Sequence, residues 1–206
     1  EQGLKTLEGH QKGAEVFREI VYAALDRGVE FISAYVFSTE NWQRTQEEVS
    51  YLMGLVLKVV DKYLDEFHQK GVKILILGSK EGLDSKTIKA LDQTVAKTAG
   101  NTKGTVALCF NYGGHQEIVD AAKALPETEK ANLTPDKFEQ YLYSKEVPAV
   151  DLVLRTSGEQ RTSGFMLWRA AYAELLFIDK YWPDFTVEDL DQALAEYTKR
   201  SRRFGK

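Results

Sequence analysis

The chain has 206 residues, of which 43% are hydrophobic and 28% are charged, and this balance excludes a chain that is disordered as a whole. Lys and Arg number 27 against 31 for Asp and Glu, so the net charge is −4; the chain has no overall positive field to hold nucleic acid, and we expect no nucleic-acid partner. The single cysteine, Cys109, excludes an internal disulfide and fits a reducing cytoplasmic compartment, and no apolar run approaches the ~18 residues of a membrane span.

The first predicted elements are a helix, a strand and a second, longer helix. Apolar residues recur at helical spacing from Val16 to Leu25, and a β-rich run covers Phe31–Phe37. Thr45 and Glu48 form a capping box, after which apolar residues step by three and four from Val49 to Phe67. Further leucines fall outside this stripe. The long helix therefore needs a second apolar neighbour, which is a partner subunit, a hydrocarbon ligand or more core.

The middle of the chain is predicted to run strand, helix, strand and then a loop-rich segment. Val72–Leu77 and Thr105–Phe110 are typical of buried strands, and a helix is expected over Thr87–Thr98 between them. Residues 124–150 hold three prolines around one capped helix from Thr134 to about Tyr143. We interpret this segment as a surface insertion.

The last part of the chain adds two short strands, Asp151–Leu154 and Leu175–Ile178, and a helix capped by Thr186 that runs into a basic tail. Strands separated by helix-length segments favour βαβ units. We therefore predict an α/β fold, with a parallel central sheet flanked by helices on both faces. Residues 1–206 are expected to form a single domain.

Polar clusters follow three of the predicted strands, at residues 38–44, 111–115 and 155–165. Ligands bind outside the carboxyl ends of the strands in such sheets, so the sequence predicts a site where these clusters meet. In the third cluster, Arg155, Arg161 and Ser163 offer two guanidinium groups and a hydroxyl among glycines, a combination suited to a phosphate or diphosphate. A solvated polar loop is the alternative. The common nucleotide-binding glycine motifs are absent from the sequence.

The other candidates each have a functional and a structural interpretation. Glu40, with Ser38 and Asn41 beside it, could belong to a proton-accepting network or could only stabilise a helix N-terminus. Trp42 could form the wall of an apolar pocket or could pack in the core. Glu174 lies among apolar residues, where a carboxylate must bind a metal or form a salt bridge.

Three further residues are less informative on their own. His10 is suited to donating to a phosphate at a helix N-terminus or to a surface position. The basic tail, which includes Arg203, is either a disordered end or an arm that reaches an anion. Cys109, inside a predicted strand, is best interpreted as packing.

Together these segments resemble the signature motifs of the cis-prenyltransferases, with the bacterial undecaprenyl diphosphate synthases as the nearest group. The resemblance covers essentially the whole chain, and its motifs occur in the same order. They are Gly9-His10-x-x-Gly13, Phe37–Trp42, Asn111–Gly114, Arg155–Ser163, Trp168–Leu175 and Arg203–Gly205.

The resemblance implies a cytoplasmic homodimer, with at most peripheral membrane contact, that condenses isopentenyl diphosphate with an allylic diphosphate such as farnesyl diphosphate. Mg²⁺ would assist the departure of diphosphate. The product would be a Z-polyprenyl diphosphate such as undecaprenyl diphosphate, the lipid-carrier precursor for cell-wall synthesis. The aspartate-rich pairs of trans-prenyltransferases are absent from the sequence, as expected for the cis class.

The resemblance also assigns roles to individual residues. Arg155, Arg161 and Ser163 match the group that holds isopentenyl diphosphate. The residues matching the reaction centre and the allylic substrate's site are Ser38, Glu40, Asn41, Trp42 and Arg44. His10 matches a diphosphate-side histidine, Glu174 a carboxylate linked to the metal, and Arg203-x-Gly205 a tail that reaches the partner's diphosphate site.

Some features depart from the family pattern. The family's opening strand and its Asp-Gly-Asn loop, which supplies the principal metal-binding aspartate, are expected upstream of Glu1, and without them we expect incomplete activity. Thr6, His115 and Gln160 replace residues that relatives usually carry. Val36 is bulkier than the alanine common in long-chain relatives, so we expect it to shorten the product.

A second hypothesis is a non-catalytic scaffold subunit of a heteromeric cis-prenyltransferase. The retained clusters at 38–44 and 155–163 favour the enzyme. A generic sugar-phosphate or nucleotide enzyme is a weaker third interpretation, which the missing glycine motifs disfavour. The chain length of the product is not fixed by the sequence.

Overall fold

The computed structural model describes residues 6–200, which fall into two compact units. The central unit comprises residues 30–148 and 164–168, and the terminal unit comprises the described residues up to 29, residues 149–163 and the described residues from 169 onward. Among residues 6–200, no helix combines the length and the apolar character that crossing a membrane requires.

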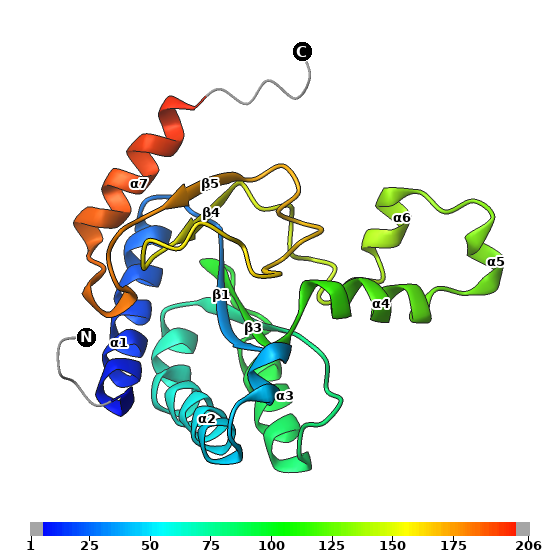
Figure 1. Ribbon diagram of the computed structural model, residues 1–206, viewed down its shortest axis with the longest axis horizontal. Coiled ribbons are helices and arrows are strands. Elements are labelled where there is room, and N and C mark those ends of the chain that lie inside the picture. The colour runs from blue at the N-terminus through cyan, green and yellow to red at the C-terminus, as the bar shows by residue number, and fades with distance from the viewer. Residues whose placement is uncertain (1–5, 201–206) are drawn as a thin grey trace. The chain divides into compact units, whose positions relative to one another are not determined.

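The central unit is built on a three-stranded parallel sheet (Figure 1). Its strands are β1 (Phe31–Ser38), β2 (Val72–Leu77) and β3 (Gly104–Tyr112), in the order β1-β3-β2. All nine residues of β3 are buried, and this central strand pairs with β1 on one side and β2 on the other. The shared direction brings the carboxyl ends of the three strands to one edge of the sheet.

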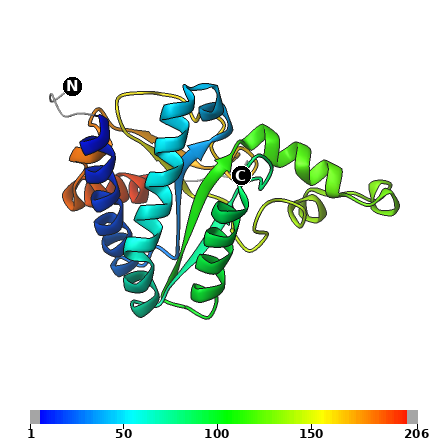
Figure 2. The same cartoon turned by 90° about the horizontal axis from the view of Figure 1, so that it is seen from below.

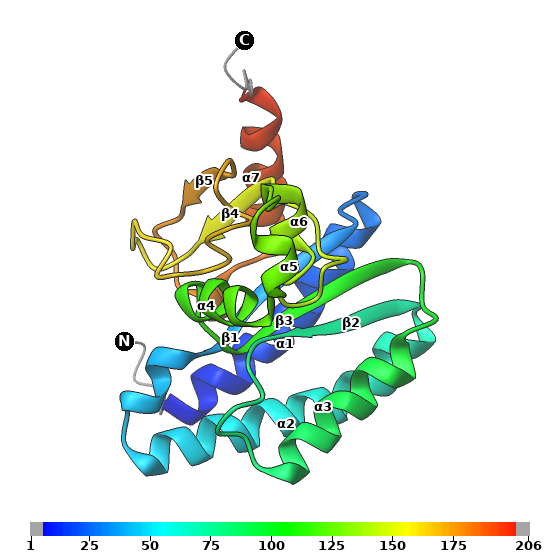
Figure 3. The same ribbon diagram turned by 90° about the vertical axis from the view of Figure 1, so that its right-hand side faces the viewer.

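Two long helices cover one face of this sheet, α2 (Gln46–Gln69) and α3 (Ser85–Thr98). They run side by side along the sheet (Figures 2 and 3), and each packs against a strand as well as against the other helix. The apolar layer beneath them contains a buried cluster, which consists of Phe37, Val49, Val56, Leu91 and Phe110. Part of the apolar face predicted for α2 is therefore buried in the core, while other apolar residues of the helix are only partly buried.

The remaining elements of the central unit follow the carboxyl ends of β1 and β3. The 3-10 helix η1 (Thr39–Gln43) directly follows β1, and α4 (Gly114–Ala124) directly follows β3. The short helix α5 (Glu127–Lys130) lies beyond the far end of α4, and α6 (Pro135–Glu139) lies back beside α4 (Figures 1 and 2), where Phe138 and Ala121 share a buried cluster. A buried carboxylate ties this region together, because Glu117 accepts from the Tyr112 hydroxyl at 2.6 Å and from the Tyr143 amide at 3.1 Å.

The terminal unit combines the first and last helices with a two-stranded parallel sheet. Its elements are α1 (Thr6–Asp26), β4 (Leu152–Arg155), β5 (Glu174–Phe177), the 3-10 helix η2 (Trp182–Asp184) and α7 (Val187–Lys199). Helix α1 packs against both η2 and α7. An ion pair between Arg27 and Asp191 joins the end of α1 to α7.

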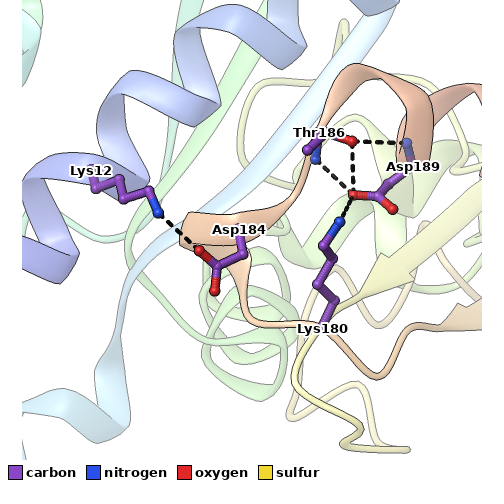
Figure 4. Close-up of polar contacts among 5 residues, drawn as sticks. All are labelled: Lys12, Lys180, Asp184, Thr186 and Asp189. Atoms are coloured by element: carbon purple, nitrogen blue, oxygen red, sulfur yellow. Dashed lines mark hydrogen bonds and ion pairs between the residues drawn. The ribbon is translucent and has the colours of Figure 1, made fainter. Parts of the chain in front are cut away.

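Local hydrogen bonds explain where α7 begins and how α1 is held (Figure 4). Thr186 and Asp189 form a reciprocal capping box at the start of α7, with the Thr186 amide donating to Asp189 at 2.8 Å. Lys180 also binds Asp189, while Lys12 of α1 donates to Asp184 of η2 at 2.8 Å. The pKa of Asp189 is lowered, chiefly by Lys180 and next by the Thr186 amide.

The α/β architecture with parallel strands is confirmed, and all five predicted strands are present within two residues of their expected bounds. Within the described residues, backbone pairing places these strands in two sheets, whereas we expected one central sheet. The helix expected from Thr134 to about Tyr143 was too long, since α6 ends at Glu139. Helix α4 was not predicted, because Gly113 and Gly114 at its start favour a loop. The single domain over residues 1–206 stays a prediction.

Candidate functional site

The exit of β1 presents the first group of candidate residues. The side-chain oxygen of Asn41 accepts from the Ser38 amide at 2.8 Å, which closes the turn between strand and 3-10 helix. Glu40 and Arg44 are exposed, whereas Ser38 and Asn41 are partly buried. The Thr39 hydroxyl lies 3.4 Å from a Glu40 carboxylate oxygen. This turn therefore fixes the backbone through Asn41 and leaves the Glu40 carboxylate open to a ligand.

Tyr35 belongs to this group, although sequence reasoning missed it. Its ring stacks on Phe165 with centroids 5.3 Å apart and meets Tyr112 edge-on at 5.9 Å. Burial raises the pKa of Tyr35 to about 12, and the charge of Glu40 adds to this, while a hydrogen bond with Ser38 acts in the opposite direction. Tyr35 thus holds a proton at neutral pH beside two of the candidate residues. Its only sequence signal was an aromatic residue within the strand that precedes the motif.

The exit of β3 lies against the exit of β1. Trp42 donates its indole N–H to the side-chain oxygen of Asn111 at 2.7 Å. Gly113 approaches Thr39 so closely that a Cβ at this position would lie 2.4 Å from the Thr39 hydroxyl oxygen. Within the central unit, the structure therefore confirms that the clusters at 38–44 and 111–115 come together.

The loop after β4 carries the third cluster, in the terminal unit. Arg155 donates to the hydroxyl of Ser163 at 2.8 Å and also to the backbone carbonyl of Arg161. Arg161 is exposed and forms an ion pair with Glu159. The three residues predicted to hold a diphosphate are thus brought together on one loop. That this loop meets the two clusters of the central unit stays a prediction.

Backbone pairing with the segment after β5 fixes the shape of this loop. The amides of Ser157 and Gly158 donate to the carbonyls of Lys180 and Ile178 at 2.7 and 3.0 Å. Both Ser157 and Gly158 have positive φ, at 72° and 70°, and Ser163 has φ of 49°. Conformations of this kind are uncommon outside glycine and often mark functional loops. The loop is therefore a defined structure, which disfavours the alternative of a merely solvated segment.

Glu174 stands at the start of β5 and is paired. Its carboxylate accepts from Arg200 at 3.1 Å, and the same guanidinium group donates to the Leu175 carbonyl at 2.9 Å. Among the residues the structure describes, no three His, Cys, Asp or Glu side chains gather in a way that could hold a metal ion. Residues 6–200 therefore contain no metal site made of protein ligands alone, whereas Mg²⁺ usually takes only one or two carboxylates together with substrate phosphates.

The remaining candidates lie at the two ends of the chain. His10 falls within α1, but its side chain is outside the described part, as are Arg203 and Gly205 entirely. Three residues after His10, the backbone of α1 contacts Trp182, whose indole N–H donates to the Gly13 carbonyl at 2.9 Å. His115 is exposed in the first turn of α4. Cys109 is fully buried, in agreement with its interpretation as packing.

Comparison with known proteins assigns the chain to a protein family. The family model described as putative undecaprenyl diphosphate synthase matches residues 1–205. The chain belongs to this prenyltransferase family. It is 44% identical to an isoprenyl transferase of Thermotoga maritima over 99% of this chain and 89% of the relative. It is 42% identical to a trans,polycis-polyprenyl diphosphate synthase of Thermobifida fusca, named as specific for (2Z,6E)-farnesyl diphosphate, over 100% of this chain and 75% of the relative.

The solved structures agree with the sequence comparison. Lavandulyl diphosphate synthase from Lavandula x intermedia, in complex with dimethylallyl diphosphate, matches with a TM-score of 0.94 and 29% identity. The match covers 100% of this chain and 91% of that structure. These findings confirm the cis-prenyltransferase resemblance and the α/β fold. The protein is therefore an isoprenyl transferase of the undecaprenyl diphosphate synthase family.

Proposed function

We propose that this isoprenyl transferase condenses isopentenyl diphosphate with an allylic diphosphate, farnesyl diphosphate, to form a Z-polyprenyl diphosphate such as undecaprenyl diphosphate. The observation that carries the proposal is the contact of Arg155 with Ser163 and with the Arg161 carbonyl on one shaped loop. A catalytic subunit must bind a diphosphate head group, and this loop gathers the donors for it.

The terminal unit supplies binding of isopentenyl diphosphate in this proposal. Guanidinium groups bind phosphate oxygens through two parallel hydrogen bonds, and such charge-assisted bonds are roughly twice as strong as neutral ones. Arg161 is exposed and its partner Glu159 lies on the same loop, so its guanidinium group can turn to an incoming anion. Arg155 serves the same diphosphate while it holds Ser163 in place.

The central unit supplies the reaction centre. In the condensation the bond between the allylic carbon and its diphosphate oxygen breaks, a new carbon–carbon bond forms, and a proton leaves the isopentenyl carbon chain. A group that accepts this proton must lie at the site. Glu40 is exposed beside Ser38 and Asn41, and we assign these three residues to the reaction centre. Trp42 and Arg44 are assigned to the position of the allylic substrate.

The growing product is a hydrocarbon, and each CH₂ that leaves water contributes about 0.8 kcal/mol. We assign the apolar side chains between α2 and the sheet to its channel. Val36 packs against this cluster together with Leu52 and Met53. The proposal predicts that a bound prenyl chain lies along α2; a chain found elsewhere would reject this assignment.

Homodimer formation, assistance by Mg²⁺ and a role in supplying the cell-wall lipid carrier belong to the same proposal. They rest on the family resemblance, as do the assignments of His10, Glu174, Arg203 and Gly205. The relatives differ in the product or primer that their names state, so the chain length has to be measured.

The test is to incubate the full-length protein with farnesyl diphosphate and labelled isopentenyl diphosphate, with and without Mg²⁺, and to determine the length of the products. We expect labelled polyprenyl diphosphates with the native protein and at least about a hundredfold less with Arg155→Ala. Thr156→Ala is the matched control on the same loop. A native protein that forms no product alone, but does so with a second subunit, would support the scaffold hypothesis instead.

A further inference from the structure

Asn111 links the exits of all three strands of the central sheet. It is 3% exposed, and its side-chain amide has a partner on each side. The oxygen accepts from Trp42 after β1, while the nitrogen donates to the carbonyls of Ser79 and Glu81 after β2, at 2.8 and 2.9 Å. Asn111 itself lies near the end of β3. Both hydrogens of the amide and its oxygen are therefore used.

The position of Asn111 does not depend on Trp42. Its backbone carbonyl accepts from the Ser79 amide at 3.1 Å, and the two carbonyls after β2 hold its nitrogen. Its φ of 50° is a left-handed conformation that asparagine tolerates better than most residues. Asn111 is thus a fixed point at the edge of the sheet.

Trp42, in contrast, is 41% exposed. Its ring meets Phe37 edge-on, with ring centroids 5.5 Å apart. In the observed orientation the indole N–H donates to the side-chain oxygen of Asn111. Any other orientation leaves the buried oxygen of Asn111 without this donor, and such a loss is costly because water does not replace it.

We infer that Asn111 is a positioning residue that fixes the Trp42 indole as a wall of the allylic-substrate site. The inference rests on the proposed function for the role of Trp42, and on the contact geometry for the role of Asn111. Asn111 acts without touching the substrate. Its effect reaches the reaction only through the orientation of Trp42.

The contact is tested first without any activity measurement. The indole N–H groups of Trp42, Trp168 and Trp182 have different acceptors, so they give separate signals in an ¹⁵N-resolved NMR spectrum. In the native protein we expect the Trp42 signal, assigned by its loss in Trp42→Phe, to be protected from exchange with solvent. In Asn111→Ala it should shift and exchange faster, while the other two signals stay in place. A native Trp42 signal without protection would overturn the inference.

The kinetic test asks whether Asn111 acts through Trp42. We expect Asn111→Ala to raise the KM for farnesyl diphosphate about tenfold and to leave the KM for isopentenyl diphosphate within about twofold. When Asn111→Ala is combined with Trp42→Phe, it should raise the KM for farnesyl diphosphate by less than about twofold beyond the effect of Trp42→Phe alone. The reason is that Trp42→Phe already removes the indole that Asn111 orients. Fully additive effects would overturn the inference. If the native protein itself shows no prenyl transfer, the proposed function fails, and the NMR result stands separately.

Two further variants separate positioning from general stability. Asn101→Ala is the matched control, because Asn101 donates to the Val72 carbonyl at 2.7 Å where β2 begins, at the opposite edge of the sheet from Trp42. It should leave both KM values unchanged. If Asn111→Ala fails to fold, Asn111→Asp carries the test. Buried against the carbonyls of Ser79 and Glu81, its carboxyl group is expected to be protonated, so it keeps an acceptor for Trp42 and one of the two donors to the β2 exit. We expect this variant to retain the Trp42 signal and the native ratio of the KM for farnesyl diphosphate to the KM for isopentenyl diphosphate. Loss of that ratio with the signal retained would refute the inference.

Discussion

Gly78→Ala is the substitution whose cost can be worked most directly from the structure. A Cβ at this position would lie 1.8 Å from the carbonyl oxygen of Phe110 and 2.9 Å from that of Asn111. Both obstacles are backbone atoms of β3, so the clash cannot be relieved by rotating a side chain. The φ of 150° adds strain for any residue with a Cβ. Overpacking and backbone strain each cost about 1–3 kcal/mol, so we expect a loss of about 2–6 kcal/mol in the free energy of unfolding.

Two other glycines of the central unit provide matched controls. Gly82 has φ of 78° with open space around its Cβ position, and Gly100 has open space and no positive φ. Gly82→Ala should therefore cost about 1–2 kcal/mol from strain alone, and Gly100→Ala should be close to neutral. Urea unfolding followed by circular dichroism measures all three on one scale. If Gly78→Ala were no more destabilised than Gly82→Ala, the close approach of β2 to β3 at this point would be wrong.

Three other substitutions test the two units. Arg155→Lys keeps the charge but loses the guanidinium nitrogen that donates to both the Ser163 hydroxyl and the Arg161 carbonyl, so steady-state kinetics should show the KM for isopentenyl diphosphate raised about 10–100-fold, with that for the allylic substrate unchanged. Val36→Ala should lengthen the product by opening the layer under α2, and an unchanged product distribution on chromatography would count against this. Asp189→Asn removes the ionised partner of Lys180. The pKa of Asp189 is lowered in the folded state, so its carboxylate stabilises the folded protein at pH values above the ordinary carboxyl pKa near 4. This stabilisation is lost as the pH falls through the lower pKa of the folded state. Thermal unfolding should therefore show the variant less stable at pH 7 and no different from wild type once Asp189 is protonated in both states.

The fold was predictable where the hydrophobic pattern is regular. The buried run from Val72 to Leu77 matched its strand, and Thr45 placed the start of α2 through its side-chain hydrogen bond. Helix α4 escaped prediction because its N-cap and first residue are glycines, whose role depends on close packing: a Cβ on Gly114 would lie 2.4 Å from the Gly164 carbonyl oxygen. Such a contact joins residues 50 positions apart, and no local pattern carries it.

The candidate site was predictable in its residue types and less so in its partners. Arg155, Arg161 and Ser163 were singled out as donors around glycines, and the structure places them on one loop. The partner of Glu174 was left open between a metal and an arginine, and among the described residues it is Arg200. This pairing depends on where the end of α7 lies relative to β5 in the tertiary structure, and the spacing of residues in the sequence does not give that position.

Burial separates the two kinds of polar residue in the central unit. Asn111, near the end of β3, and Glu117, in the first turn of α4, are nearly inaccessible and have protein partners for their side-chain oxygens, because buried polar atoms without a partner cannot be solvated. Glu40 and Arg44 are exposed and are not fixed in this way. A buried polar residue should therefore affect stability and geometry when changed, whereas an exposed one should affect turnover with little loss of stability. Unfolding and kinetic measurements on the same variants would distinguish the two classes, and equal stability losses for both would contradict the distinction.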